Sequence, residues 1–295
     1  MAWIFSYPGL ILCYGFLYLS VLLLWVPGKR KIKTWQVSFV LALFFGLISR
    51  QVEWGGLVAL ALLAAGSYYS QAKNTTPKKR LAATSLVLFL CLGLASHQMP
   101  GFSNLLVLDH VYFTTDALPY TLFLNFDIAA IGILILGFGP ALISSRDTLE
   151  QLVREYWQIA LSMILGLSIV AMILGFVRIE PKLSIHLFLW LPTNLLFTCV
   201  AEEALFRGFI QKKLTQQVKD AKGETYWALL LASFLFGLAH YTGGKKYVLL
   251  ATLAGLGYGW IYQRTKRIEA SILTHFTLNL TQFLFFTYPA LASAI

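Results

Sequence analysis

Charged residues are scarce in this chain of 295 residues, and that scarcity limits what the protein can be. Only 12% of the residues are Asp, Glu, Lys or Arg, whereas a soluble globular domain carries roughly 25%. Apolar residues make up 58% of the chain. This composition excludes an ordinary soluble domain and indicates a protein of the lipid bilayer.

Cysteine is rare as well. The three cysteines, Cys13, Cys91 and Cys199, lie far apart in apolar stretches. Their spacing fits neither a disulfide framework nor a zinc site, so we expect them to be packing residues. We predict no metal and no other cofactor. The sequence also shows no internal repeat and no low-complexity segment.

What the chain has in abundance is long apolar runs. A helix needs about 20 apolar residues to cross a hydrocarbon core about 30 Å thick. The sequence therefore predicts an all-α fold, a polytopic transmembrane helical bundle of about ten spans, of which the second, third, eighth and ninth are short. The expected spans are Trp3 to Val26, Trp35 to Ser49, Trp54 to Tyr69, Leu81 to Ser96, Leu118 to Ile143, Tyr156 to Phe176, Ile185 to Arg207, Tyr226 to His240, Tyr247 to Tyr262 and Ser271 to Tyr288.

The positive charge follows from this topology. The chain has 23 Lys and Arg against 13 Asp and Glu, a net charge of +10. With the amino terminus outside, most of the basic residues fall in inner loops, as they do in membrane proteins generally. No nucleic-acid partner is needed to explain the charge. We expect a multi-pass protein in contact with the lipid bilayer, in the bacterial inner (plasma) membrane.

The chain is predicted to divide near residue 150. Residues 1–150 would form an amino-terminal region of five spans with few polar groups. Asp127 is the exception, and we favour a structural hydrogen bond for it. The stretch from His97 to Asp116 is expected to be a surface helix or loop. Residues 151–295 carry the residues that indicate chemistry and are interpreted as a catalytic transmembrane domain.

Two adjacent carboxylates, Glu202 and Glu203, lie inside the seventh predicted span. A charge in lipid costs at least ~2.5 kcal/mol, so such a pair usually faces a water-filled cavity. On an α-helix, Glu203 and Arg207 are at i and i+4, where opposite charges meet. Glu202 points about 100° away and would face something else.

Two further pairs at i and i+4 spacing follow: Phe236 with His240, and His275 with Asn279. A lone histidine in a bundle is usually a packing residue, but together with Glu202 these residues indicate a site. A carboxylate and a histidine can deprotonate a water molecule. A second histidine and an asparagine can donate hydrogen bonds to a developing oxyanion. The set predicts hydrolysis of an acyl bond.

The predicted depths of these residues do not agree. By helix rise, Glu202 and His275 lie toward the inner ends of their spans, whereas His240 lies at the outer end of a short span. A tilted, broken or displaced eighth segment would resolve the conflict, and so would a site near mid-membrane. The stretch from Tyr241 to Lys246 could also dip back as a loop that lines a water-filled cavity. Pro192 could also kink the helix that carries Glu202.

The three motifs, taken in order, resemble those of a known family. Glu202-Glu203-x-x-x-Arg207, Phe236-x-x-x-His240 and His275-x-x-x-Asn279 are similar to the signature of the CAAX protease and bacteriocin-processing family, whose best-known members are the type II CAAX prenyl endopeptidases. The resemblance covers roughly residues 155–288. Residues 1–150 are not covered.

The resemblance implies an intramembrane endopeptidase of the glutamate type, acting on a membrane-associated peptide or protein. The positions that match Glu202 and His240 activate water in such enzymes. Those that match His275 and Asn279 form the oxyanion hole. Those that match Glu203, Arg207 and Phe236 support the site. The resemblance fixes neither the identity of the substrate nor the oligomeric state.

Three alternatives remain open. A proton- or ion-coupled transporter could use the same residues, but transporters tend to show related halves, which this sequence lacks. A zinc-dependent version of the same protease is possible in principle, although Asn279 is a poor zinc ligand. An inactive relative could act as a scaffold, but all the motif positions are filled. We favour the glutamate-type peptidase.

Overall fold

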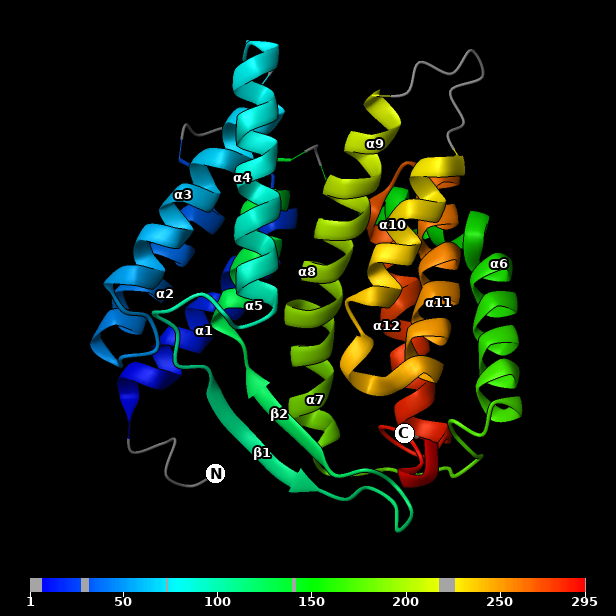
Figure 1. Ribbon diagram of the computed structural model, residues 1–295. Helices are drawn as coiled ribbons and strands as arrows, with labels where there is room; N and C mark the ends of the chain where they lie inside the picture. Colours follow the sequence, from blue (N-terminus) through cyan, green and yellow to red (C-terminus); the bar gives the residue numbers. More distant parts are fainter. Residues whose placement is uncertain (1–6, 28–31, 73, 140–141, 218–225, 295) are drawn as a thin grey trace. The chain divides into compact units, whose positions relative to one another are not determined.

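The computed structural model describes residues 7–27, 32–72, 74–139, 142–217 and 226–294. These residues are mostly helical and form two compact units (Figure 1). The first unit comprises Met1–Val107, Phe123–Ser144 and Leu196–Leu205, and the second comprises Leu108–Leu122, Ser145–Leu195 and Phe206–Ile295. Neither unit is one continuous stretch, so the packing does not follow a single cut at residue 150. The predicted functional division there stays a prediction.

The first unit is built around one buried helix, α5 (Phe126–Gly137), which is apolar on every side. Such a helix is stable only when other elements cover it completely. The helices of this unit are α1 (Pro8–Leu22), α2 (Thr34–Ile48), α3 (Trp54–Gln71), α4 (Pro77–Ala95) and the short α8 (Val200–Glu203). Of these, α1, α3, α4 and α8 contact α5, and from α2 the Phe39 ring lies 6.2 Å from the ring of Phe126.

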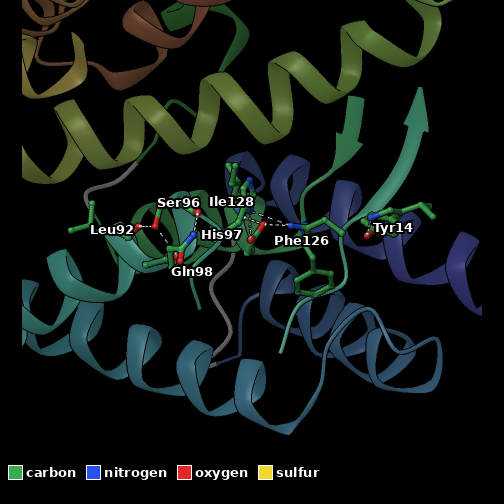
Figure 2. Close-up of polar contacts among 11 residues, drawn as sticks. Tyr14, Leu92, Ser96, His97, Gln98, Phe126 and Ile128 are labelled. Carbon is green, nitrogen blue, oxygen red and sulfur yellow. Dashed lines mark hydrogen bonds and ion pairs between the residues drawn. The ribbon is translucent and has the colours of Figure 1, made fainter. Parts of the chain in front are cut away.

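A polar network fixes the start of α5. The Asp127 carboxylate is buried and accepts hydrogen bonds from the backbone N–H of Ile128 (2.8 Å) and from Asn104 Nδ2 (3.0 Å). Its other oxygen lies 2.7 Å from His97 Nδ1. Figure 2 draws His97 together with Phe126 and Ile128. Asn104 Oδ1 accepts from the N–H of Phe126 (2.9 Å). Asp127 therefore has the structural role that the sequence favoured, tying a loop to the helix.

The second unit is a helical bundle centred on α11 (Gly244–Thr265), which packs against α6, α10 and α12. Its other helices are α6 (Arg146–Ile173), α7 (Leu187–Thr193), α9 (Lys212–Gln217), α10 (Tyr226–Leu238) and α12 (Ile268–Phe285). Local sequence explains the helix ends. The Ser145 hydroxyl caps α6 by accepting from the N–H of Thr148, and α11 ends at Lys266, which adopts a left-handed conformation.

One unbroken helical run extends from Leu187 to Gln217 and contains two π-helical turns. The turns are Asn194–Cys199 and Ala204–Gln211, and they flank the short α-helical stretch α8 that holds Glu202 and Glu203. Wide turns of this kind are rare and occur frequently at functional sites. The first one begins directly after Pro192, which has no N–H to donate to the preceding turn.

The helical structure is interrupted at His240, the residue whose predicted depth did not agree with that of Glu202. After α10 ends at Leu238, a short 3₁₀ turn (Tyr241–Gly243) leads into α11, and the two helices meet at a bend of 58°. His240 therefore lies just after the end of α10, at its junction with α11. The predicted eighth span is itself one continuous helix, so the break lies between the eighth and ninth predicted spans, and the depth of His240 relative to Glu202 stays a prediction.

Two described helices are long and apolar enough to cross a membrane, Pro8–Trp25 and Arg146–Ile173, and the bent pair of α10 with α11 would make a third. Large apolar side chains also lie on outer helix faces, such as Phe89 and Ile173, which are 68% and 78% exposed. Apolar outer faces of this size require lipid or a partner. The chain is a helical membrane protein, whereas the count of about ten spans stays a prediction.

Three sequence predictions are wrong in part, and one of them is the surface helix or loop expected from His97 to Asp116, which contains a strand. The fold is not purely α-helical, because β1 (Leu105–Val111) and β2 (Tyr120–Leu124) form a two-stranded sheet. The predicted fifth span, Leu118 to Ile143, consequently begins as a strand, and its helix α5 has only 12 residues. The reason is local, since aromatic and β-branched residues such as those of β2 favour a paired strand.

Some predictions fall outside the described residues. They include the first residues of the first predicted span (3–6), two residues of the fifth (140–141), and several loop lysines and arginines in 28–31 and 218–225 on which the predicted orientation depends.

The His97–Asp127 contact should make the stability of the protein depend on pH. The hydrogen bond to Asp127 raises the pKa of His97, although partial burial opposes this. Protonated His97 therefore stabilises the folded state below an unfolded pKa of about 6.5, and this contribution disappears as pH rises through the folded pKa.

We expect the unfolding temperature in detergent to fall as the pH is raised through this window. His97→Gln should remove that dependence, at a cost at low pH of about 1 kcal/mol or less, since the ring is half-exposed. His110→Gln, at an exposed surface pair with Asp109, is the control and should retain it. An unchanged pH profile in His97→Gln would contradict the assignment.

The contact between α10 and α11 depends on Gly237. A Cβ atom there would collide with Thr252 Oγ1 and would lie 2.8 Å from the carbonyl oxygen of Val248. Gly237→Ala should therefore lower the free energy of unfolding by about 1–3 kcal/mol. Gly166→Ala on α6 is the control, since nothing lies within 4 Å of its Cβ. Equal stabilities of the two variants would show that this close approach is unimportant.

Candidate active site

Within the second unit, a hollow of about 640 Å³ is lined by residues of α6, α10, α11 and α12 and by the chain around them. Four of the residues predicted from the sequence line it: Phe236, His240, His275 and Asn279. They come from positions up to 43 residues apart, as their numbers show. The structure thus brings both histidines and the asparagine to one cavity, whereas their catalytic roles stay predictions.

A backbone contact sets the tautomer of the neutral His240 ring. Its Nδ1 lies 2.7 Å from the carbonyl oxygen of Phe236, four residues earlier. A carbonyl oxygen can only accept, so Nδ1 must carry the proton of the neutral ring. The acceptor lone pair is then on Nε2. The i and i+4 spacing therefore also allows the backbone carbonyl of Phe236 to orient the His240 ring.

The Phe236 side chain lies between the two histidines. Its ring centroid is 4.7 Å from that of His240 and 5.8 Å from that of His275. It is also edge-on to Tyr258, at 6.0 Å. Phe236 is buried, so its ring is a fixed spacer that keeps both imidazoles at the cavity wall.

His275 is buried on α12 and stacks on Tyr258 of α11, with ring centroids 4.6 Å apart and planes 17° from parallel. A hydrogen bond locks the two helices at this point, because the Ser271 hydroxyl donates to the carbonyl oxygen of Tyr258 at 2.9 Å. One turn after His275, Asn279 also lines the hollow. Its Nδ2 donates to Asn194 Oδ1 at 3.2 Å.

Arg207 supports this aromatic group from within the protein. The guanidinium is fully buried and lies 4.4 Å from the Phe236 ring centroid and 5.3 Å from that of Tyr258. It donates to the carbonyl oxygen of Gly255 at 3.0 Å. Residue 255 must be small, since a Cβ there would come within 3.2 Å of both Arg207 Nη2 and Ser233 Cα.

Glu202 and Glu203 belong to the first unit, where α8 packs against α5. The approach is close at Gly132, where a Cβ would lie 3.0 Å from Ala201 Cα. Glu203 is fully buried. Arg207, His240, His275 and Asn279 belong to the second unit. The predicted pairing of Glu203 with Arg207 and the predicted partnership of Glu202 with His240 therefore stay predictions.

Three residues that shape this site were not predicted from the sequence. Tyr258 stacks on His275, Asn194 accepts from Asn279, and Tyr247 lies 5.1 Å from the His240 ring. Tyr258 stands between two glycines in Gly257-Tyr258-Gly259, a pattern that hints at close packing. Asn194 and Tyr247 have no comparable signal in the sequence.

The hollow holds two imidazoles as potential metal ligands, and no Asp, Glu or Cys is among the described residues that line it. A catalytic zinc site uses three protein ligands. A zinc-dependent version of the site would therefore need a third ligand, and Glu202 is the candidate that the motifs supply.

Comparison with known proteins shows what this part of the chain is similar to. Residues 184–281 match the family described as "Type II CAAX prenyl endopeptidase Rce1-like". The resemblance predicted from the three motifs is confirmed over this segment. All seven predicted site residues fall within the matched range.

A relative from Bacillus subtilis (strain 168), named "Putative membrane peptidase YdiL", is 34% identical over 80 residues. The match covers 27% of this chain and 30% of the relative, so this chain spans less than a third of the relative's length. No solved structure matches the chain.

We expect the planar shape of the Arg207 guanidinium, which lies against two aromatic rings, to stabilise the folded state. Arg207→Lys keeps the charge but removes the planar face and the fork of donors, so we expect a loss of about 1–2 kcal/mol in the free energy of unfolding. Arg264→Lys is the matched control, because Arg264 also lies over an aromatic ring (Trp260, 5.4 Å) but is exposed. Chemical denaturation in detergent measures both. Equal losses would contradict the special role of the buried stack.

Proposed function

We propose that this protein is an intramembrane endopeptidase of the glutamate type, which hydrolyses a peptide bond of a membrane-associated protein or peptide. The observation that carries the proposal is the convergence of His240, His275 and Asn279 on one cavity of the second unit. The family match over the same residues supports it. A multi-pass protein of the bacterial inner membrane is part of the proposal.

In the proposed reaction, Glu202 and His240 activate a water molecule. The orientation of His240 supports this role, because Nδ1–H is directed to the Phe236 carbonyl oxygen and Nε2 is the basic atom of the neutral ring. The water oxygen attacks the carbonyl carbon of the substrate peptide bond as its proton passes to the base. That proton later reaches the amine of the leaving group as the C–N bond breaks.

His275 and Asn279 are proposed to stabilise the oxyanion of the tetrahedral intermediate. A neutral imidazole N–H and an amide N–H are both donors, and one such donor contributes about 3 kcal/mol in well-studied enzymes. Two features support this role: the stacking of His275 on Tyr258, and the contact of Asn279 with Asn194, since both hold side chains that line the hollow. Fixed donors are effective because they need no reorganisation during the reaction.

The cavity suits a substrate that lies in the bilayer. Much of its wall is apolar, with Leu167, Phe176, Leu250 and Leu278 among the lining residues. Apolar side chains of a membrane-bound substrate could be buried there.

The proposal predicts new peptide termini that depend on Glu202. Membranes from cells expressing the wild type should contain termini that are absent when Glu202→Gln is expressed at the same level. Loss of a catalytic base typically lowers the rate by roughly 10²- to 10⁴-fold. A loss of this size is enough to remove the product termini from a mass-spectrometric catalogue. His240→Ala should have the same effect.

Glu155→Gln is the matched control, because Glu155 is exposed on α6, and it should give the wild-type termini. Identical termini in all membranes, with every variant folded and abundant, would contradict proteolysis and favour a transporter or scaffold. If instead the purified active protein holds about one zinc per chain and chelation abolishes its activity, the zinc-dependent version is correct.

A further inference from the structure

The side chain of Asn279 contacts a second amide, that of Asn194, which is distant in sequence. Its Nδ2 donates to Asn194 Oδ1 at 3.2 Å, across 85 residues of chain. Asn279 lines the hollow, whereas Asn194 is not among the residues that line it. The contact therefore links a cavity residue to a residue behind it.

We propose that Asn194 is a positioning residue that fixes the orientation of the Asn279 amide. The inference rests on the proposed function, in which Asn279 donates a hydrogen bond to the oxyanion. The two ends of an amide group are nearly the same in shape but opposite in hydrogen bonding, since one end donates twice and the other accepts. Rotation by half a turn would present an oxygen to the developing negative charge.

An acceptor at the right place prevents that rotation. The Asn194 oxygen takes one N–H of Asn279 Nδ2, which keeps the nitrogen end of the amide on the donating side. In the proposed reaction, the nitrogen end of the amide then faces the oxyanion. In the rotated state, two amide oxygens would face each other, and the hydrogen bond between the two part-buried side chains would be lost.

The backbone around Asn194 is built to present this side chain. Asn194 is the first residue of the π-helical turn Asn194–Cys199 and follows Pro192 by two positions. The Thr193 hydroxyl donates to the carbonyl oxygen of Leu189, one turn earlier, at 2.8 Å. A wide turn changes the direction of the side chains it contains relative to a regular helix. The rare geometry thus has a use at the site.

The experiment compares two substitutions of similar size that differ in hydrogen bonding. Asn194→Asp supplies a carboxylate, which can only accept, so the orientation of Asn279 should be kept. Asn194→Leu removes the acceptor. The probe is an internally quenched peptide that spans the cleavage site found from the new termini. Its hydrolysis by purified protein in detergent gives kcat and KM, and Gln158→Leu on the exposed face of α6 is the control.

We expect Asn194→Leu to lower kcat by roughly 10- to 100-fold with little change in KM, since an oxyanion donor acts mainly in the transition state. Asn194→Asp should stay within a few-fold of the wild type. The second test is a double-mutant cycle with Asn279→Ala. Once the Asn279 amide is gone, Asn194→Leu should cause almost no further loss.

Each outcome decides the matter. Additive losses in the cycle, or an unchanged kcat in Asn194→Leu, would overturn the positioning role and leave the proposed peptidase intact. The cycle gives this answer even if Asn194→Asp does not fold. A wild-type protein that fails to cleave the peptide would overturn the proposed function, and the positioning role with it.

Discussion

The contact on which the site depends is the packing of the Phe236 ring. One buried ring meets the guanidinium of Arg207, the imidazoles of His240 and His275, and the ring of Tyr258. The same residue supplies the carbonyl oxygen that orients His240. The Phe236 ring is a rigid apolar spacer that touches the Arg207 cation and both histidines. This shared contact explains why these residues occur together in the motifs. Removing or shrinking the ring would release several functional groups at once.

Close backbone approach makes this packing possible. Gly237 lets α10 lie against Thr252 and Val248 of α11, and Gly255 leaves room for Arg207. The break after α10 then places His240 at a helix junction instead of on a helix face. In a membrane, an interrupted backbone is tolerated where it is buried in protein or borders water. The interruption at His240 meets this condition, because it lies beside the hollow and its polar lining residues.

The sequence predicted residues that share one cavity better than it predicted their surroundings. Phe236, His240, His275 and Asn279 all line the hollow, while their catalytic roles stay predictions. Asn194 could not be predicted, since its proposed role depends on a π-helical turn and on a contact 85 residues away. The β1–β2 sheet was missed because its apolar residues continue into the apolar run of α5, so hydrophobicity alone could not separate strand from helix. The first half of the chain gave a correct prediction of helices and of a structural Asp127, but hydropathy could not show that a helix of 12 residues would be the buried centre of a unit.

The central claim is that the hollow of the second unit is where the substrate reacts, and photo-crosslinking tests it most directly. A peptide that spans the cleavage site and carries a diazirine at the scissile position would be irradiated with the Glu202→Gln protein. The account predicts adducts on residues that line the hollow, such as Tyr247, Leu278 or Gln282, which an excess of unlabelled peptide prevents. Adducts confined to the outer faces of the helices, or adducts in the hollow that unlabelled peptide does not displace, would contradict it.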